Sequence, residues 1–156
     1  MAHTIVRRTT LVVRDIEKSV AFYRDALGLR VYYDSELELS GRVMPIAREG
    51  AKCHLVIMQA DDPWIGMIGL MQVTDPPEPD PGPYRQRLSI GDVAFVMASD
   101  DARGVFERVR ASGVQLIAEP ELSTVPKPGG GEIRMITSSF FDPDGYFIEV
   151  NQRLED

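Results

Sequence analysis

The pattern of apolar and polar residues along the chain changes from the period of a strand to that of a helix and back. Residues 8–13 are rich in β-branched side chains and predict a strand. Asp15 follows as a typical helix N-cap, and Gly28 is a typical helix end. Between them, apolar residues recur at spacings of three and four: Ile16, Val20, Tyr23 and Leu27. This pattern predicts a helix directly after the first strand.

Three further extended segments follow the predicted helix, at residues 29–39, 52–59 and 65–73. The first alternates acidic residues with others and is expected to be partly exposed, whereas the second is strongly apolar. Residues 41–50 show no clear pattern. One strand, one helix and three strands therefore make up the first half of the chain.

The region from 74 to 89 carries five prolines, which disfavour both helices and central strands. After it the pattern starts again, with a strand at 92–97, a helix from Ser99–Asp101 to Gly113, and extended segments at 114–117 and 132–141. A shift of about 84 residues lays Arg8 on Asp92 and Phe22 on Phe106, which indicates a duplicated unit.

These patterns predict an α+β fold made of two tandem βαβββ modules, because runs of consecutive strands favour antiparallel pairing. We place the first module at residues 1–74, a proline-rich linker at 75–90 and the second module at 91–156. Neither half has much core alone, so we expect one curved, barrel-like mixed sheet with a central cleft.

The last hairpin contains the most unusual acid of the chain. The sequence Asp142-Pro143-Asp144-Gly145 strongly predicts a tight turn between two apolar strands. In the second strand, Phe147, Glu149 and Asn151 share one face because side chains alternate. Glu149 is either a solvated residue of an edge strand or a carboxylate that is paired, hydrogen-bonded or bound to metal.

Composition narrows the function classes. The 156 residues are 44% hydrophobic and carry a net charge of −7, which describes a globular protein and argues against a nucleic-acid partner. The single cysteine, Cys53, excludes an intrachain disulfide and fits a reducing cytoplasm. We find no signal peptide or membrane-spanning stretch in the sequence and expect no membrane partner.

Three segments resemble the vicinal oxygen chelate superfamily, which includes glyoxalase I, extradiol dioxygenases and bleomycin-resistance proteins. Residues 11–29 resemble its first strand and helix, and residues 92–113 resemble the start of its second module. Residues 140–149, Phe-Phe-Asp-Pro-Asp-Gly-Tyr-Phe-Ile-Glu, resemble its last hairpin. The resemblance spans nearly the whole chain and implies the fold, but one fold hosts many reactions.

The resemblance also implies four positions that hold a metal in the metal-dependent members. They fall on Arg8, Gly69, Asp92 and Glu149. Arginine has no acceptor to offer and glycine has no side chain, so the set is poor for a transition metal, and we predict no metal cofactor. The alternative is a metal held by Asp92, Glu149 and His54.

Without a metal, Arg8 is predicted to lie between Asp92 and Glu149 as a built-in cation. In the functional version Arg8 orients a substrate carboxylate or enolate while Glu149 moves a proton; in the structural version the three form an inert ion pair network. Beside these catalytic candidates, we expect ligand contacts from His54, Gly69, Met71, Trp64 and Phe147.

Three functions remain open at this level. The first is a metal-independent lyase or isomerase, resembling glyoxalases, that transfers a proton on a small carbonyl compound. The second is a binding protein that sequesters its ligand without catalysis, like the bleomycin-resistance members, and the third is a divalent-metal enzyme. The resemblance also implies a homodimer.

Overall fold

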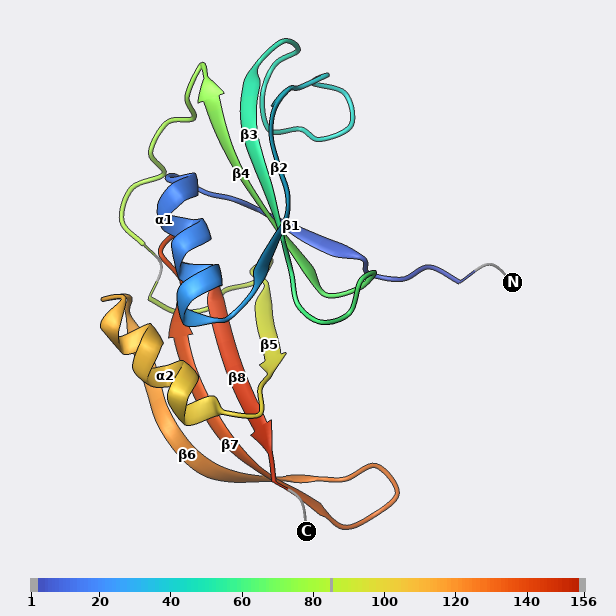
Figure 1. Cartoon of the computed structure of the whole chain (residues 1–156), viewed down its shortest axis with the longest axis vertical. Helices are drawn as coiled ribbons and strands as arrows, with labels where there is room; N and C mark the ends of the chain where they lie inside the picture. Colours follow the sequence, from blue (N-terminus) through green and yellow to red (C-terminus); the bar gives the residue numbers. More distant parts are fainter. Residues whose placement is uncertain (1–2, 85, 155–156) are drawn as a thin grey trace. The chain divides into compact units, whose positions relative to one another are not determined.

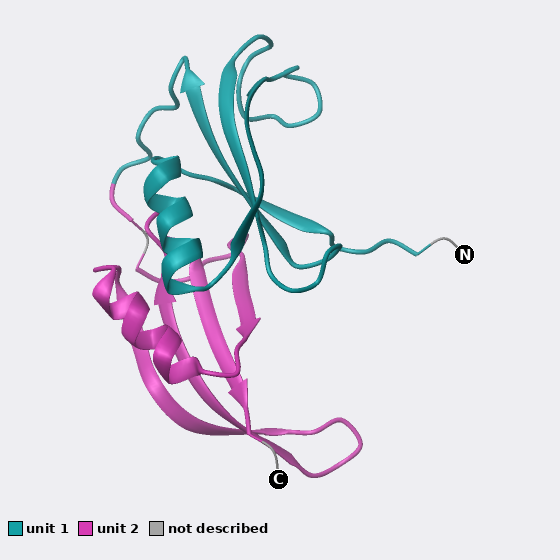
Figure 2. Ribbon diagram, viewed as in Figure 1, with its two compact units in different colours: residues 1–82 teal, residues 83–156 magenta. Residues whose placement is uncertain are grey.

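The order of strands and helices along the chain repeats once (Figure 1). The computed structural model describes residues 3–84 and 86–154, so the predicted linker at 75–90 includes one position, 85, outside the described residues. The chain divides into two units, residues 1–82 and 83–156 (Figure 2). Within the described residues, no helix is long and apolar enough to cross a membrane.

The first unit contains one mixed sheet and one helix. Strand β1 (Arg8–Val12) leads into helix α1 (Ile16–Ala21), which continues as a π-helical segment, η1 (Phe22–Ala26). Three strands follow: β2 (Arg30–Glu38), β3 (Lys52–Gln59) and β4 (Met67–Asp75). The strand order is β1-β4-β3-β2, in which β1 is parallel to β4 and the other neighbours are antiparallel.

The second unit has the same topology. It consists of β5 (Ala94–Ala98), α2 (Ala102–Ala111), β6 (Leu116–Pro126), β7 (Glu132–Phe141) and β8 (Phe147–Arg153), in the order β5-β8-β7-β6. The predicted α+β fold with two βαβββ modules is confirmed. The predicted barrel-like closure and central cleft involve both units together and remain predictions.

Each helix begins at an aspartate that binds a free backbone N–H of the first turn. Asp15 accepts a hydrogen bond from Lys18 N at 3.0 Å, and Asp101 accepts one from Gly104 N at 2.8 Å. The N-terminal N–H groups of a helix have no partner within the helix, so such caps stabilise it. The predicted N-cap of the first helix is therefore confirmed.

A glutamine from the last strand of each unit provides a second cap. Gln72 accepts a hydrogen bond from Ile16 N at 3.0 Å, and Gln152 accepts one from Ala102 N at 3.1 Å. Both glutamines thus tie the start of a helix to the strand beneath it. The same glutamine cap in both units supports the duplication.

The spacing between the two units differs from the predicted 84 residues. The N-caps Asp15 and Asp101 are 86 residues apart, so the counterpart of Arg8 is Ala94 and not Asp92. The predicted spacing is two residues too short. Strand side chains alternate with a period of two, so a shift of two residues keeps every side chain on the same face and the apolar pattern does not detect it. Asp92 lies before β5 begins.

The first sheet buries apolar side chains on both of its faces. Helix α1 packs against β3 and β4 (Figure 1). On that face, alternating residues of these two strands are buried, among them Val56, Met58, Ile68 and Leu70. On the opposite face, a second cluster is formed by Cys53, Leu55, Ile57, Met67 and Met71, with Leu37, Leu39 and Ile46 packed against it. Burial also raises the pKa of the Cys53 thiol, which disfavours a reactive thiolate.

The buried face of the first helix differs in part from the predicted stripe. Ile16, Phe22 and Tyr23 are buried as expected, whereas Val20 and Leu27 are only half-buried. The π-helical turn at Phe22–Ala26 accounts for Leu27, because a wider turn rotates the side chains that follow it relative to a regular 3.6-residue period.

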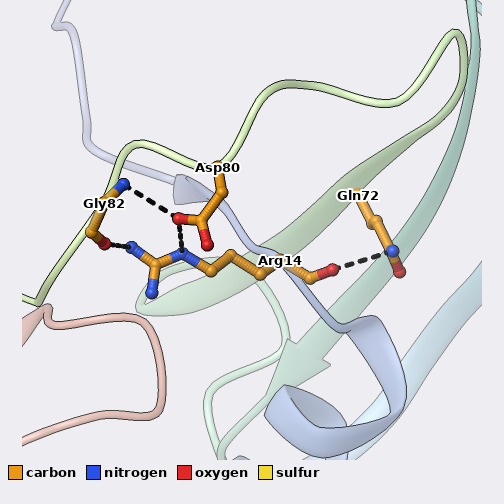
Figure 3. A network of polar contacts seen from close by, with 4 residues as sticks. All are labelled: Arg14, Gln72, Asp80 and Gly82. Atoms are coloured by element: carbon orange, nitrogen blue, oxygen red, sulfur yellow. Dashed lines mark hydrogen bonds and ion pairs between the residues drawn. The ribbon is translucent and has the colours of Figure 1, made fainter.

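The proline-rich segment after β4 is attached to the first unit by Arg14. The Arg14 guanidinium donates to the Gly82 carbonyl at 2.9 Å and lies 3.5 Å from Asp80 Oδ1, while Gln72 Nε2 donates to the Arg14 carbonyl at 2.8 Å (Figure 3). Asp80 also accepts a hydrogen bond from Gly82 N. Part of the predicted linker therefore packs as an ordered segment of this unit.

Candidate functional site

The face of the first sheet opposite α1 carries an open pocket. Its volume is about 570 Å³, within the range of pockets that hold small organic ligands. Its walls combine apolar and polar side chains, and the polar ones include two consecutive arginines. The lining residues are Ile5, Val6, Arg7, Arg8, Thr10, Tyr32, Ile57 and Met67.

Arg8 lies across β4 at the one position that has no side chain. A Cβ atom at Gly69 would lie 3.2 Å from Arg8 Cδ, 3.4 Å from Arg8 Nε and 2.9 Å from Thr10 Oγ1. Gly69 pairs with Thr10 in the parallel ladder, so all three residues are neighbours on the pocket face. The structure thus brings together two of the predicted site residues, Arg8 and Gly69.

The two arginines of the pocket differ in how they are held. The guanidinium carbon of Arg7 lies 4.8 Å from the centre of the Trp64 ring, in a cation–π contact. Arg8 forms no ion pair with any described acid of the first unit, so its donors remain available to a ligand. Trp64, a predicted ligand contact, therefore reaches the pocket through Arg7 and is not a lining residue itself.

The loop that presents Trp64 is organised by Asp62. Its Oδ1 atom accepts hydrogen bonds from Trp64 N at 2.7 Å and from Ile65 N at 3.0 Å. These bonds, the one from Trp64 first, lower the pKa of the Asp62 carboxyl below its ordinary value, because they stabilise the charged form.

Because folding lowers the pKa of the Asp62 carboxyl, this group stabilises the folded loop at pH values above its ordinary pKa, near 4. The stabilisation is lost as the pH falls through the lower pKa of the folded state. We therefore expect the fluorescence of Trp64, the only tryptophan, to change below about pH 4. Asp62→Ala should produce the same change already at neutral pH, with Asp61→Ala as the control. An Asp62→Ala emission spectrum identical to that of the wild type would contradict this role.

The other residues predicted on this half of the chain lie on both faces of the sheet. Met71 is buried in the apolar cluster on the pocket face. His54 alternates with Cys53 and Leu55 and so lies on the opposite face, where its Nε2 atom is 2.6 Å from Asp34 Oδ1. The structure does not bring His54 together with Arg8, Gly69 or Met71.

In the second unit, Glu149 ends a chain of four polar side chains across three strands. Asn151 Nδ2 donates to Glu149 Oε1 at 2.8 Å, and Thr137 Oγ1 donates to Asn151 Oδ1 at 2.7 Å. Ser123 Oγ lies 2.9 Å from Thr137 Oγ1. The Ser123 hydroxyl also lies within 3.5 Å of the Met135 carbonyl, to which it can donate its single proton.

The Thr137 hydroxyl and the Asn151 amide thus both donate toward the carboxylate, and one bond polarises the next. Within the described part of the second unit, Glu149 Oε2 has no hydrogen-bond partner and can face a ligand. Phe147 shares the face of Glu149, as predicted from the period of two, and stacks edge-on against Phe141 at 5.7 Å. Sequence reasoning placed Asn151 on this face but missed Ser123 and Thr137, whose only signal is a hydroxyl at an alternating strand position.

Asp92 has a local partner in the turn before β5. Its Oδ2 atom accepts a hydrogen bond from Ser89 N at 2.7 Å, while Asp92 N donates to the Ser89 carbonyl at 3.1 Å. The carboxylate therefore closes a turn. The predicted arrangement of Arg8 between Asp92 and Glu149 joins residues of both units and remains a prediction.

The two units differ in the chemistry of matching faces. Gly69 pairs with Thr10, and Glu149 pairs with Val96. Thr10 and Val96 are matching positions of β1 and β5, so Gly69 and Glu149 are counterparts. By the same register, Met71 is the counterpart of Asn151. At these two positions the second unit has polar side chains where the first has glycine and methionine.

The residues at the four metal positions implied by the resemblance do not fit a divalent metal. The space beside Gly69 is occupied by the Arg8 side chain, and a guanidinium has no lone pair for a cation. Within the described ranges, no three or more His, Cys, Asp and Glu side chains come together in a way that could hold a metal. His54, from the alternative ligand set, is paired with Asp34.

Comparison with known proteins agrees with the duplicated βαβββ fold. A family model of the Glyoxalase/Bleomycin resistance protein/Dioxygenase superfamily matches residues 5–150. The chain belongs to this superfamily. No functionally curated protein matches the sequence.

Several solved structures of the superfamily resemble the chain over nearly its full length. A glyoxalase family protein from Bacillus cereus has a TM-score of 0.74 and 18% identity, with 99% of both chains covered. Glyoxalase I of Leishmania major has a TM-score of 0.60 and 16% identity, with 96% of this chain and 87% of that chain covered. An antibiotic-binding protein from Streptomyces has a TM-score of 0.60 and 19% identity, with 99% of both chains covered. At these identities the likeness shows the shared fold alone.

Proposed function

We propose that this superfamily member binds a small organic molecule in the pocket of its first unit. The observation that carries the proposal is the pocket itself, a space of about 570 Å³ whose walls include the apolar residues Ile5, Val6, Ile57 and Met67. Apolar walls with a few fixed polar groups are typical of small-molecule sites, because apolar burial provides affinity and polar groups provide orientation. The antibiotic-binding protein from Streptomyces shows that this fold supports such binding elsewhere.

Titration with the neutral fluorescent probe N-phenyl-1-naphthylamine tests the proposal. We expect binding with a dissociation constant on the order of 10 to 100 µM, as for a small apolar ligand in a preformed pocket. Thr10→Phe places a ring inside the pocket and should weaken binding at least about tenfold through steric exclusion, a change of about 1.4 kcal/mol.

Val31→Phe serves as the matched control, because it adds the same ring beside Tyr32 on β2 at an exposed position that does not line the pocket. Thermal unfolding of both variants verifies that the fold is intact. No probe binding by the wild-type protein, or equal binding by the Thr10→Phe variant, would overturn the proposal.

A second candidate function is metal-independent proton transfer on a small carbonyl compound, with Glu149 as the general base. The observation that favours it is the hydrogen-bonded chain from Ser123 through Thr137 and Asn151. This chain holds one carboxylate oxygen in place, while the other has no hydrogen-bond partner within the described part of the second unit and can take up a proton, as a general base requires. Such a lyase or isomerase needs no cofactor, whereas simple sequestration of a ligand does not need this chain.

A further inference from the structure

Two positive charges lie beside the apolar wall of the pocket in a protein whose net charge is −7. Arg7 and Arg8 both line the pocket, and its other lining residues include no acid. Distant acids of the protein are screened within about 10 Å at 0.1 M salt, so these nearby guanidinium groups dominate the electrostatics of a bound molecule.

The two guanidinium groups differ in their contacts. Arg7 is stacked on Trp64 at 4.8 Å, and the backbone of the Trp64 loop makes two hydrogen bonds to Asp62. Arg8 extends over Gly69, where a Cβ atom would lie 3.2 Å from Arg8 Cδ and 2.9 Å from Thr10 Oγ1. Charged groups that are already ordered lose little conformational entropy when a ligand arrives.

We propose that the pocket selects organic anions, meaning molecules with an apolar body and one carboxylate, sulfonate or enolate oxygen. Arg8 provides the charge-assisted hydrogen bonds to the anionic group, because its planar fork of donors suits an oxyanion. Ile57 and Met67 contact the apolar body. Gly69 determines this specificity indirectly, because its missing side chain leaves the space in which Arg8 lies. This proposal rests on the proposed binding function of the same pocket.

Two probes with the same ring system distinguish the contribution of the charge to binding affinity from that of the apolar contacts. 1-Anilinonaphthalene-8-sulfonate carries a sulfonate on the rings of N-phenyl-1-naphthylamine, which is neutral. We expect the wild-type protein to bind the sulfonate probe roughly five- to tenfold more tightly at about 0.1 M salt, where the distant acids are screened; this is the usual effect of a charge-assisted hydrogen bond at a partly exposed site.

Arg8→Met keeps an apolar side chain of similar length and removes the charge. It should abolish the preference for the sulfonate probe, so that this variant binds the two probes about equally. Arg103→Met is the control. Arg103 is an exposed arginine of α2, so this substitution removes the same charge outside the pocket. Gly69→Ala should reduce the preference without removing any charge, because its Cβ displaces Arg8.

Each outcome supports or overturns one proposal. If neither probe binds, the proposed binding function fails. If the wild-type protein binds both probes equally, or if the Arg8→Met variant keeps the preference, the selection of anions is overturned while small-molecule binding stands. A preference lost equally in the Arg103→Met variant would show that net charge, and not the pocket, attracts the sulfonate probe.

Discussion

Glu149→Gln is expected to lower protein-catalysed proton exchange by roughly 100- to 10,000-fold, the usual contribution of a positioned general base. The amide has the shape of the carboxylate and can still accept the hydrogen bond from Asn151, so the chain of Thr137 and Asn151 persists. Only the ability to take up a proton is lost. The result therefore tests chemistry and not folding.

The measurement is the loss of acidic C–H proton signals of hydroxyacetone and dihydroxyacetone in D₂O, followed by NMR with and without protein. Glu132→Gln is the matched control, because Glu132 is an exposed acid on β7. Exchange by the Glu149→Gln variant at the wild-type rate would exclude Glu149 as the base. If the wild-type protein causes no exchange, the proton-transfer function is contradicted for these compounds and ligand binding alone is supported.

Leu70→Ala should destabilise the protein by about 3 to 5 kcal/mol, the range for a leucine removed from a well-packed core. Leu70 is fully buried in β4 on the face that α1 covers. Its neighbour Gly69 lies on the pocket face, because adjacent residues of a strand point to opposite sides. The substitution should therefore lower stability strongly and leave probe affinity nearly unchanged.

Urea unfolding followed by circular dichroism measures the free energy of unfolding, and fluorescence titration measures probe binding below the unfolding transition. Leu122→Ala is the control, since Leu122 is exposed on β6 and should change stability by less than about 0.5 kcal/mol. A cost below about 1 kcal/mol for Leu70→Ala would contradict the assigned core. A large loss of probe binding in the folded variant would contradict the separation of the two faces.

The sequence alone predicted those structural features that depend on residues close together in the chain. The N-cap at Asp15 and the full extent of strand 52–59 agree with their predictions. The shared face of Phe147, Glu149 and Asn151 follows directly from the period of two, and the bond between Asn151 and Glu149 confirms it. The duplication was also visible as a repeated order of elements.

The sequence did not predict the contacts between segments that lie far apart in the chain. The caps by Gln72 and Gln152 join residues that are 56 and 50 positions apart. The π-helical turn at Phe22–Ala26 moved Leu27 away from the predicted stripe. The shift from 84 to 86 residues between the units followed from strand register, which apolar patterning leaves ambiguous in steps of two.

The amino-acid sequence by itself determined the βαβββ repeat, the helix starts and the faces of the strands, because these depend on side chains a few positions apart. Only the tertiary structure decided that Arg8 fills the space beside Gly69, that His54 pairs with Asp34 on the other face, and that Ser123 and Thr137 extend the hydrogen-bonded chain to Glu149. These arrangements depend on which strands become neighbours and in which register, and that choice is made by packing of the whole sheet.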